Sequence, residues 1–294
     1  MPVTGDWVAL RVPEGEGSAL VAAVLPRATC FSRRAAGRAE REQVVAANLD
    51  TVLLMTGLDN DFSPRRIERY LAAAWQSGAR PVVVLNKLDL CAEPEKQIRA
   101  VEQVAVGAPI HAVSALRGDG LEALAQYCGP AQTVALVGSS GVGKSTLINR
   151  LLGEALQSTQ PVGDDGRGRH TTTRRELLFT ASGGMVIDTP GMRELGLWED
   201  EEGLERTFDE IETLARECRY RDCRHLDEPG CAVRAAVEEG TLSASRLDSM
   251  QKLRREMDWL KRRESPLEEL AEKRKWKTIH KSVKRFMKES PKYQ

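Results

Sequence analysis

A glycine-rich turn between a strand-like run and a helix-like run limits this chain to few folds. Residues 138–146 read GSSGVGKST, directly after the apolar run TVALV, and residues 144–152 have helical spacing. The pattern G-x-x-x-x-G-K-[ST] in this context is typical of a loop whose backbone N–H groups cradle phosphates at a helix N-terminus. We predict that Lys144 reaches the β- and γ-phosphates of a nucleotide and that Ser145 ligates Mg²⁺. The predicted nucleotide contacts of this loop are Gly138, Ser139, Ser140, Gly141, Val142, Gly143, Lys144, Ser145 and Thr146.

Strand-like and helix-like segments alternate on both sides of this loop. Short runs rich in Val, Ile and Leu occur at 51–57, 81–86, 110–115 and 184–188. Such runs are expected for strands that are covered on both faces. Helical spacing occurs between them, at 64–77 and 95–105. We predict an α/β domain with a parallel sheet over residues 46–200.

Two segments that precede the glycine-rich loop suit recognition of a guanine base. NKLD at 86–89 follows a strand-like run, so it is expected at the edge of the sheet where such folds bind ligands. The Asp89 carboxylate can accept hydrogen bonds from the ring N–H and the amino group of guanine, and adenine offers neither donor. We expect Asn86 to secure this loop and the stem of Lys87 to lie over the ring. In VSALRGDG, Ser114 and Ala115 would place backbone groups near the guanine oxygen.

Two segments that follow the loop suit Mg²⁺ and the γ-phosphate. DTPG begins with Asp188, which can hold Mg²⁺ through water, and ends with Gly191, whose N–H can contact the γ-phosphate. HTTT at 170–173 lies in a stretch rich in Gly and Arg, and one of its threonines is expected to ligate Mg²⁺. We assign Thr172 to this role, with Thr173 as a close competitor.

The residue that orients the attacking water is less obvious. Many GTP-hydrolysing proteins have a glutamine directly after the segment that corresponds to DTPG, whereas this chain has Met192. His170, beside the threonines, is our candidate for orienting the water instead. Lys144 is the second catalytic candidate, because it would hold a fixed positive charge at the β- and γ-phosphates.

A cluster of cysteines and one histidine predicts a metal site. Cys218, Cys223, His225 and Cys231 lie within fourteen residues. Three thiolates and one imidazole complete a tetrahedral zinc site with no open position for water. We therefore predict one structural zinc ion per chain.

The two ends of the chain differ from its centre. Alternating pieces at 7–12 and 20–25 predict a small β domain over residues 1–45, and we expect 26–43, with five arginines, to be an exposed basic loop. Residues 201–294 predict a zinc-binding helical domain.

The predicted helices of this last region are 235–260 and 266–287. Residues 251–294 contain 15 Lys+Arg and 7 Asp+Glu, although the whole chain has 43 of each. A positive segment on an acidic body indicates contact with nucleic acid or with an acidic surface, with a solvated helix face as the equal alternative.

No part of the chain suggests a membrane protein. No apolar run approaches the about 18 residues that a membrane-spanning helix needs. The N-terminus also lacks the basic start and apolar stretch of a secretory signal. We expect a cytoplasmic protein.

The nucleotide motifs occur in an unusual order. In an ordinary small GTPase the phosphate loop comes first, whereas here NKLD and VSA precede it. A permuted chain can keep the same site if the original termini lay close together, which is common in compact domains. The region after residue 200 would then be attached directly to the DTPG segment.

With these motifs, the chain closely resembles the ribosome small-subunit-dependent GTPase A family (RsgA, also called YjeQ). The resemblance covers nearly the whole chain, including REQVVAANLD, GRGRHTTT and CRYRDCRHLDEPGCAV. It implies an N-terminal OB-type barrel, a circularly permuted GTPase domain and a C-terminal zinc domain. Because little sequence precedes residue 5, we expect the barrel to be partial.

The resemblance also implies a function and partners. It implies action in late maturation of the 30S ribosomal subunit, with faster GTP hydrolysis on the subunit. We also expect contacts with 16S rRNA and a monomer. It points to His170 as the hydrolysis residue. Two other classes remain as alternatives on the sequence alone: a kinase of a small metabolite, and a non-catalytic RNA-binding module that retains nucleotide.

Overall fold

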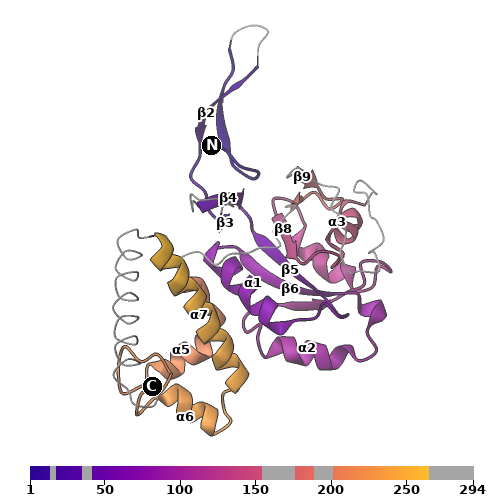
Figure 1. Cartoon of the computed structure of the whole chain (residues 1–294). Helices are drawn as coiled ribbons and strands as arrows, with labels where there is room; N and C mark the ends of the chain where they lie inside the picture. The colour runs from indigo at the N-terminus through magenta and orange to yellow at the C-terminus, as the bar shows by residue number, and fades with distance from the viewer. Residues whose placement is uncertain (14–17, 35–41, 154–175, 189–200, 265–294) are drawn as a thin grey trace, which may run out of the picture.

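The computed structural model describes residues 1–13, 18–34, 42–153, 176–188 and 201–264. A central α/β unit carries an N-terminal hairpin that points away from it, and the C-terminal helices pack beside α1 (Figure 1). None of the helices in the described residues is long and apolar enough to cross a membrane.

The central unit is built on a six-stranded sheet with the order β7-β6-β5-β8-β10-β9. Its strands are β5 (Thr51–Gly57), β6 (Arg80–Asn86), β7 (Ile110–Ala112), β8 (Thr133–Gly138), β9 (Glu176–Phe179) and β10 (Met185–Asp188). Neighbouring strands from β7 to β10 are parallel, but β9 is antiparallel to β10. The predicted parallel sheet is therefore present from β7 to β10, and the antiparallel strand at its edge was not predicted. The short, mostly exposed β9 lacks the buried apolar run that identified the other strands.

Helices cover both faces of this sheet. The helices α1 (Pro64–Gln76) and α2 (Pro94–Glu102) contribute to one apolar cluster, and α3 (Lys144–Leu152) and η2 (Leu121–Tyr127) contribute to the other. Because side chains alternate along a strand, neighbouring residues of β5 enter opposite clusters. The predicted helices at 64–77, 95–105 and 144–152 are close to these bounds.

The N-terminal strands form two separate two-stranded sheets. One pairs β1 (Val8–Arg11) with β2 (Leu20–Val24), and the other pairs β3 (Cys30–Arg34) with β4 (Glu42–Ala47). The prediction that 26–43 is an exposed loop is wrong at β3, because Phe31 is fully buried in the core of the central unit. Within the described residues these strands do not close into a barrel.

The described part of the C-terminal region, residues 201–264, is helical, as predicted. It contains α4 (Glu202–Thr207), α5 (Asp209–Ala215), α6 (Ala232–Glu238) and α7 (Ala244–Glu264). The prediction of one helix over 235–260 is wrong, because Gly240 has a φ of 78° and ends α6. The backbone N–H groups of Thr241 and Leu242 donate back to the carbonyl of Ala236. The predicted helix at 266–287 lies outside the described residues.

One buried arginine joins these helices to the central unit. Arg246 of α7 donates to the carboxylates of Glu68 on α1, at 2.7 Å, and Glu210 on α5, at 2.6 Å. Its guanidinium carbon also lies 4.2 Å from the centre of the Phe208 ring. Both Arg246 and Glu68 are buried, so this ion pair fixes α7 against α1.

Candidate nucleotide site and metal centre

The phosphate loop connects β8 to α3. Gly141 and Gly143 have φ values of 73° and 97°, which L side chains rarely adopt. A side chain at Gly138 would lie 2.6 Å from the carbonyl oxygen of Met55 on the neighbouring strand. Lys144 Nζ donates to the carbonyl oxygens of Gly138 and Ser139 at 2.8 and 2.5 Å. The ammonium group therefore lies against the loop that the motif predicts to hold phosphates.

Asn86, at the end of β6, links three separate motifs. Its Nδ2 donates to the carbonyl of Val142 at 2.7 Å, and its Oδ1 accepts from the N–H of Ala115 at 2.9 Å. A Cβ at Gly143 would lie 2.3 Å from this Nδ2, so the glycine is needed for contact as well as for its φ angle. NKLD, VSA and the phosphate loop therefore meet at one buried amide.

The predicted base-reading carboxylate is held by a buried hydroxyl. Ser114 Oγ donates to Asp89 Oδ1 at 2.5 Å, and the N–H of Arg117 donates to the same hydroxyl at 3.1 Å. Ser114 is fully buried. Two predicted base contacts, from segments that follow β6 and β7, are thus brought together at one edge of the sheet.

Only some of the residues predicted to bind Mg²⁺ or the γ-phosphate lie within the described part of the chain. Asp188 ends β10, which runs parallel to β8, so it lies at the same edge of the sheet as the phosphate loop. Ser145 and Thr146 lie in the first turn of α3. His170, Thr172, Thr173, Gly191 and Met192 lie outside the described residues.

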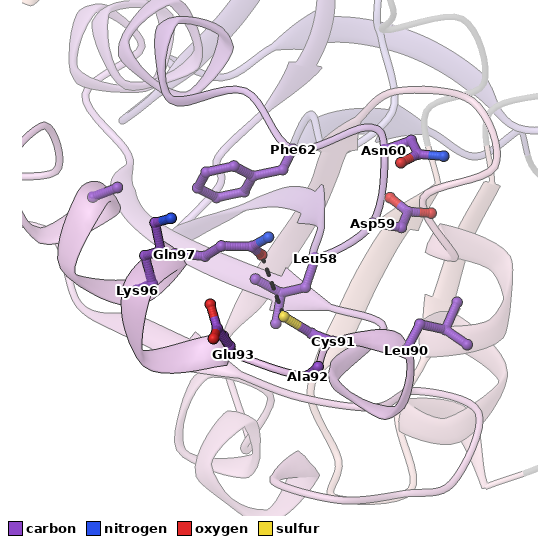
Figure 2. Close-up of a pocket in the computed structure, with 11 residues that line it drawn as sticks. Leu58, Asp59, Asn60, Phe62, Leu90, Cys91, Ala92, Glu93, Lys96 and Gln97 are labelled. Atoms are coloured by element: carbon purple, nitrogen blue, oxygen red, sulfur yellow. Dashed lines mark hydrogen bonds between the residues drawn. The ribbon is translucent and has the colours of Figure 1, made fainter.

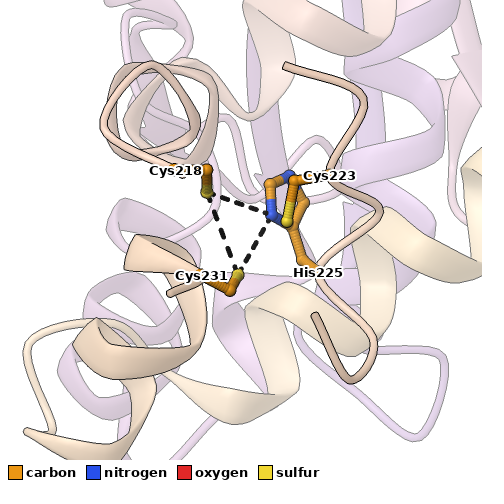
Figure 3. A group of neighbouring side chains, drawn as sticks. All are labelled: Cys218, Cys223, His225 and Cys231. Atoms are coloured by element: carbon orange, nitrogen blue, oxygen red, sulfur yellow. Dashed lines mark hydrogen bonds between the residues drawn. The ribbon is translucent and has the colours of Figure 1, made fainter. Parts of the chain in front are cut away.

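The four predicted metal ligands form one compact group (Figure 3). Their ligand atoms all lie within 4.8 Å of one another. Cys218 Sγ lies 3.7 Å from His225 Nδ1 and 3.9 Å from Cys231 Sγ, and the His225 Nδ1 to Cys231 Sγ distance is 3.4 Å. A tetrahedral zinc site has ligand–ligand edges of about 3.4–3.8 Å. The residues therefore fit a metal ion.

The surroundings of these ligands also suit a metal. Burial lowers the pKa of His225, and the charge of Arg254 lowers it further, so the imidazole is neutral at neutral pH, as a metal ligand must be. Gln251 of α7 donates to the carbonyl of His225 at 2.9 Å. The N–H of Arg234, in the first turn of α6, donates to Cys231 Sγ at 3.4 Å. Helices on both sides thus orient the ligands.

Sequence reasoning missed several charged residues near these sites. Asp59 and Asp61, between β5 and α1, contact the NKLD segment and the phosphate loop. The buried pair of Glu68 and Arg246 was also missed. For the two aspartates a signal existed, because LDND directly follows the strand-like run at 51–57.

The fold and the site together define a circularly permuted P-loop GTPase. The base-reading segments precede the phosphate loop in the chain, yet all three are linked through Asn86 in the structure.

A family model described as RsgA GTPase matches residues 24–198, more than half of the chain, and the chain belongs to this family. The proteins of Opitutus terrae and Methanosarcina acetivorans named small ribosomal subunit biogenesis GTPase RsgA are 54% and 46% identical to it. The alignments cover 95% and 98% of this chain and 79% and 78% of those proteins.

Solved structures agree with this assignment. YjeQ from Thermotoga maritima matches with a TM-score of 0.65 and 32% identity, over 87% of this chain and 84% of that one. YloQ, described as a circularly permuted GTPase, matches with a TM-score of 0.61 and 25% identity, over 88% and 81%. The predicted family, the permuted GTPase fold and the GTP-hydrolysing activity are confirmed. These matches do not favour the kinase or the non-catalytic alternative.

Proposed function

We propose that the protein binds the small (30S) ribosomal subunit, assists its late maturation, and hydrolyses GTP to GDP and phosphate with turnover that the subunit stimulates. The main support for GTP binding is the pair of Asn86 hydrogen bonds, which join the base-reading segments to the phosphate loop. The ribosomal part is supported by the names of its relatives, which are small ribosomal subunit biogenesis GTPases.

Each part of the nucleotide site has a role in binding or hydrolysis under this proposal. Asp89 accepts the guanine N–H groups, the stem of Lys87 lies over the ring, and the backbone around Ser114 and Ala115 meets the guanine oxygen. The phosphate loop surrounds the phosphates, and Lys144 stabilises the charge that develops on them during hydrolysis.

Mg²⁺ and water complete this mechanism. Ser145, Thr172 and Asp188 would hold Mg²⁺, which when bound neutralises charge on the β- and γ-phosphate oxygens. The N–H of Gly191 senses the γ-phosphate. His170 orients the water that attacks it, since Met192 cannot.

We further propose the organisation around this site. A partial OB-type β domain over 1–45 would precede the GTPase domain at 46–200, with a zinc-binding helical domain at 201–294. The four ligands, Cys218, Cys223, His225 and Cys231, support one structural zinc ion per chain. The basic segments near Arg33 and at 275–288 would contact 16S rRNA, and the protein would act as a cytoplasmic monomer.

Measured GTP turnover tests this proposal. With purified small subunits, wild-type turnover should rise strongly, because Met192 cannot orient the attacking water and the protein alone should hydrolyse GTP slowly. The His170→Ala variant should keep GTP and subunit binding but lose most of the stimulated rate. Asp89→Asn should lose the preference for GTP over ATP. Subunits that leave the wild-type rate unchanged would count against the ribosomal role and leave the GTPase assignment intact.

A further inference from the structure

An ion pair lies where β5 and β6 end side by side. Gly57 of β5 pairs with Asn86 of β6, and the N–H of Leu58 donates to the carbonyl of Asn86 at 2.8 Å. The two chains then leave the sheet together. Asp59 and Lys87 follow these paired ends, and Lys87 Nζ lies 2.6 Å from Asp59 Oδ2.

The backbone has a notable feature at each residue of this pair. Lys87 has a left-handed φ of 66°, which is uncommon for a residue with a long side chain. Asp59 Oδ1 accepts a hydrogen bond of 3.1 Å from the N–H of Asp61. Burial by itself would raise the pKa of Asp59, but the hydrogen bonds from Lys87 and from Asp61 outweigh it and hold the pKa below its ordinary value. The carboxylate is therefore charged at neutral pH.

A glycine provides the space for this carboxylate. A Cβ added to Gly57 would lie 2.3 Å from Asp59 Oδ1, and its φ is not in the left-handed region. Glycine at position 57 therefore provides space for the Asp59 carboxylate, and the backbone conformation there does not require it. An alanine there would push the carboxylate away while leaving the strand intact.

The turn that carries Asp59 is itself fixed to the phosphate loop. Ser139 Oγ donates to Asp61 Oδ2, and Arg66 of α1 donates to Asp61 Oδ1 at 2.6 Å. Asp59 also lines a cavity of about 600 Å³ between this turn and the start of α2 (Figure 2). A changed side chain at position 59 therefore has room and does not require the core to repack.

We propose that Asp59 is a positioning residue of the base site, which fixes the ammonium group of Lys87 so that the lysine stem lies ready across the guanine ring. A lysine side chain has many rotamers, and fixing its end before binding reduces the entropy lost on binding. The inference rests on the proposed guanine site, in which Lys87 contacts the base and Asp89 reads it.

Nucleotide binding and turnover by the full-length protein test this role. Asp59→Asn should weaken GDP and GTP binding about fivefold each, because a partly exposed ion pair is lost. KM for GTP should rise by a similar factor while kcat stays unchanged, since the base contact is the same in the ground and transition states. Gly57→Ala should reproduce both effects through displacement of the carboxylate.

The route through Lys87 is tested by a double substitution. Lys87→Met keeps the apolar stem and removes the charge, so adding Asp59→Asn to it should change GDP affinity no further. Asp248→Asn is the matched control, because it removes a carboxylate whose ion pairs are instead with Arg65 of α1, at 2.9 Å, and Lys252 of α7, at 2.8 Å. It should leave GDP affinity unchanged.

Three results would overturn the inference. GDP affinity could be unchanged in Asp59→Asn and Gly57→Ala, it could rise because Lys87 is released, or it could fall equally with and without Lys87→Met. Asp89→Asn separates these results from failure of the guanine site itself. If Asp89→Asn leaves the preference for GTP over ATP unchanged, the proposed guanine site is wrong. If Asp89→Asn loses this preference but Asp59→Asn leaves GDP affinity unchanged, only the positioning role of Asp59 is wrong.

Discussion

The side-chain amide of Asn86 donates a hydrogen bond of 2.7 Å to the carbonyl oxygen of Val142, which ties the end of β6 to the phosphate loop. Asn86→Ala removes this bond and the bond from Ala115, and it leaves buried backbone groups without partners. Each such group costs about 1–3 kcal/mol. We expect the free energy of unfolding to fall by about 2–4 kcal/mol and GDP affinity to fall at least about tenfold.

Denaturant unfolding and GDP titration measure these two effects. Asn60→Ala is the control, because Asn60 is an exposed asparagine on a nearby loop. Its stability and affinity should match the wild type. Wild-type GDP affinity in Asn86→Ala would mean that the two loops hold their positions without this link.

The metal centre should be required for the local fold of the C-terminal helices. Cys231 is a candidate metal ligand, and its Sγ also accepts a hydrogen bond from the N–H of Arg234 at the start of α6. Cys231→Ser should abolish bound zinc and increase proteolysis after Cys218, because metal binding and local folding are coupled. Metal analysis of purified protein should give one zinc ion per wild-type chain and per chain of the control Cys91→Ser. A zinc-free wild type with intact C-terminal helices would refute the assignment.

The buried ion pair between Arg246 and Glu68 should dominate the attachment of α7 to the central unit. Arg246→Met leaves Glu68 buried without this partner, which costs about 3–5 kcal/mol. The exposed pair of Arg65 and Asp248 also connects α1 to α7, and Arg65→Met should cost at most about 1 kcal/mol. Denaturant unfolding compares the two variants. Equal losses would show that burial of the pair is unimportant.

The base of the N-terminal hairpin should depend on pH through Asp6. Arg27 donates to both Asp6 oxygens, at 2.7 and 2.9 Å, and this hydrogen bonding is the main cause that holds the pKa of Asp6 below its ordinary value. A depressed carboxyl pKa stabilises the fold above the unfolded-state pKa of about 3.9, and the contribution is lost as pH falls through the folded-state pKa.

Asp6→Asn should therefore reduce the free energy of unfolding by about 1 kcal/mol at pH 7. The difference from wild type should shrink as pH falls below about 4 and then through the lower folded-state pKa of Asp6, because the carboxylate is protonated first in the unfolded chain and then in the folded chain. Unfolding curves at pH 7, 5 and 3 measure this. A difference that stays constant down to pH 3 would mean that Asp6 acts through its shape and not through its charge.

The sequence by itself was enough to predict the residues of both candidate sites and the main helices and strands around them. The phosphate loop, NKLD and the ligands from Cys218 to Cys231 are recognisable because their function depends on fixed spacing over a few residues. The starts of α1 and α2 can also be predicted from a few neighbouring residues, because each helix has a proline in its first turn. The buried strands were predicted because a strand that is covered on both faces needs apolar residues at successive positions.

Only the tertiary structure decided which distant charges meet. Lys87 and Asp59 are 28 residues apart, and Arg246 and Glu68 are 178 apart, and no periodicity relates such positions. The antiparallel β9 and the burial of Phe31 were missed for a related reason, because both depend on packing against the central unit and not on local pattern. Side-chain contacts of this kind are selected by the fold as a whole, which brings together residues whose local sequence is typical of a solvated loop or helix face.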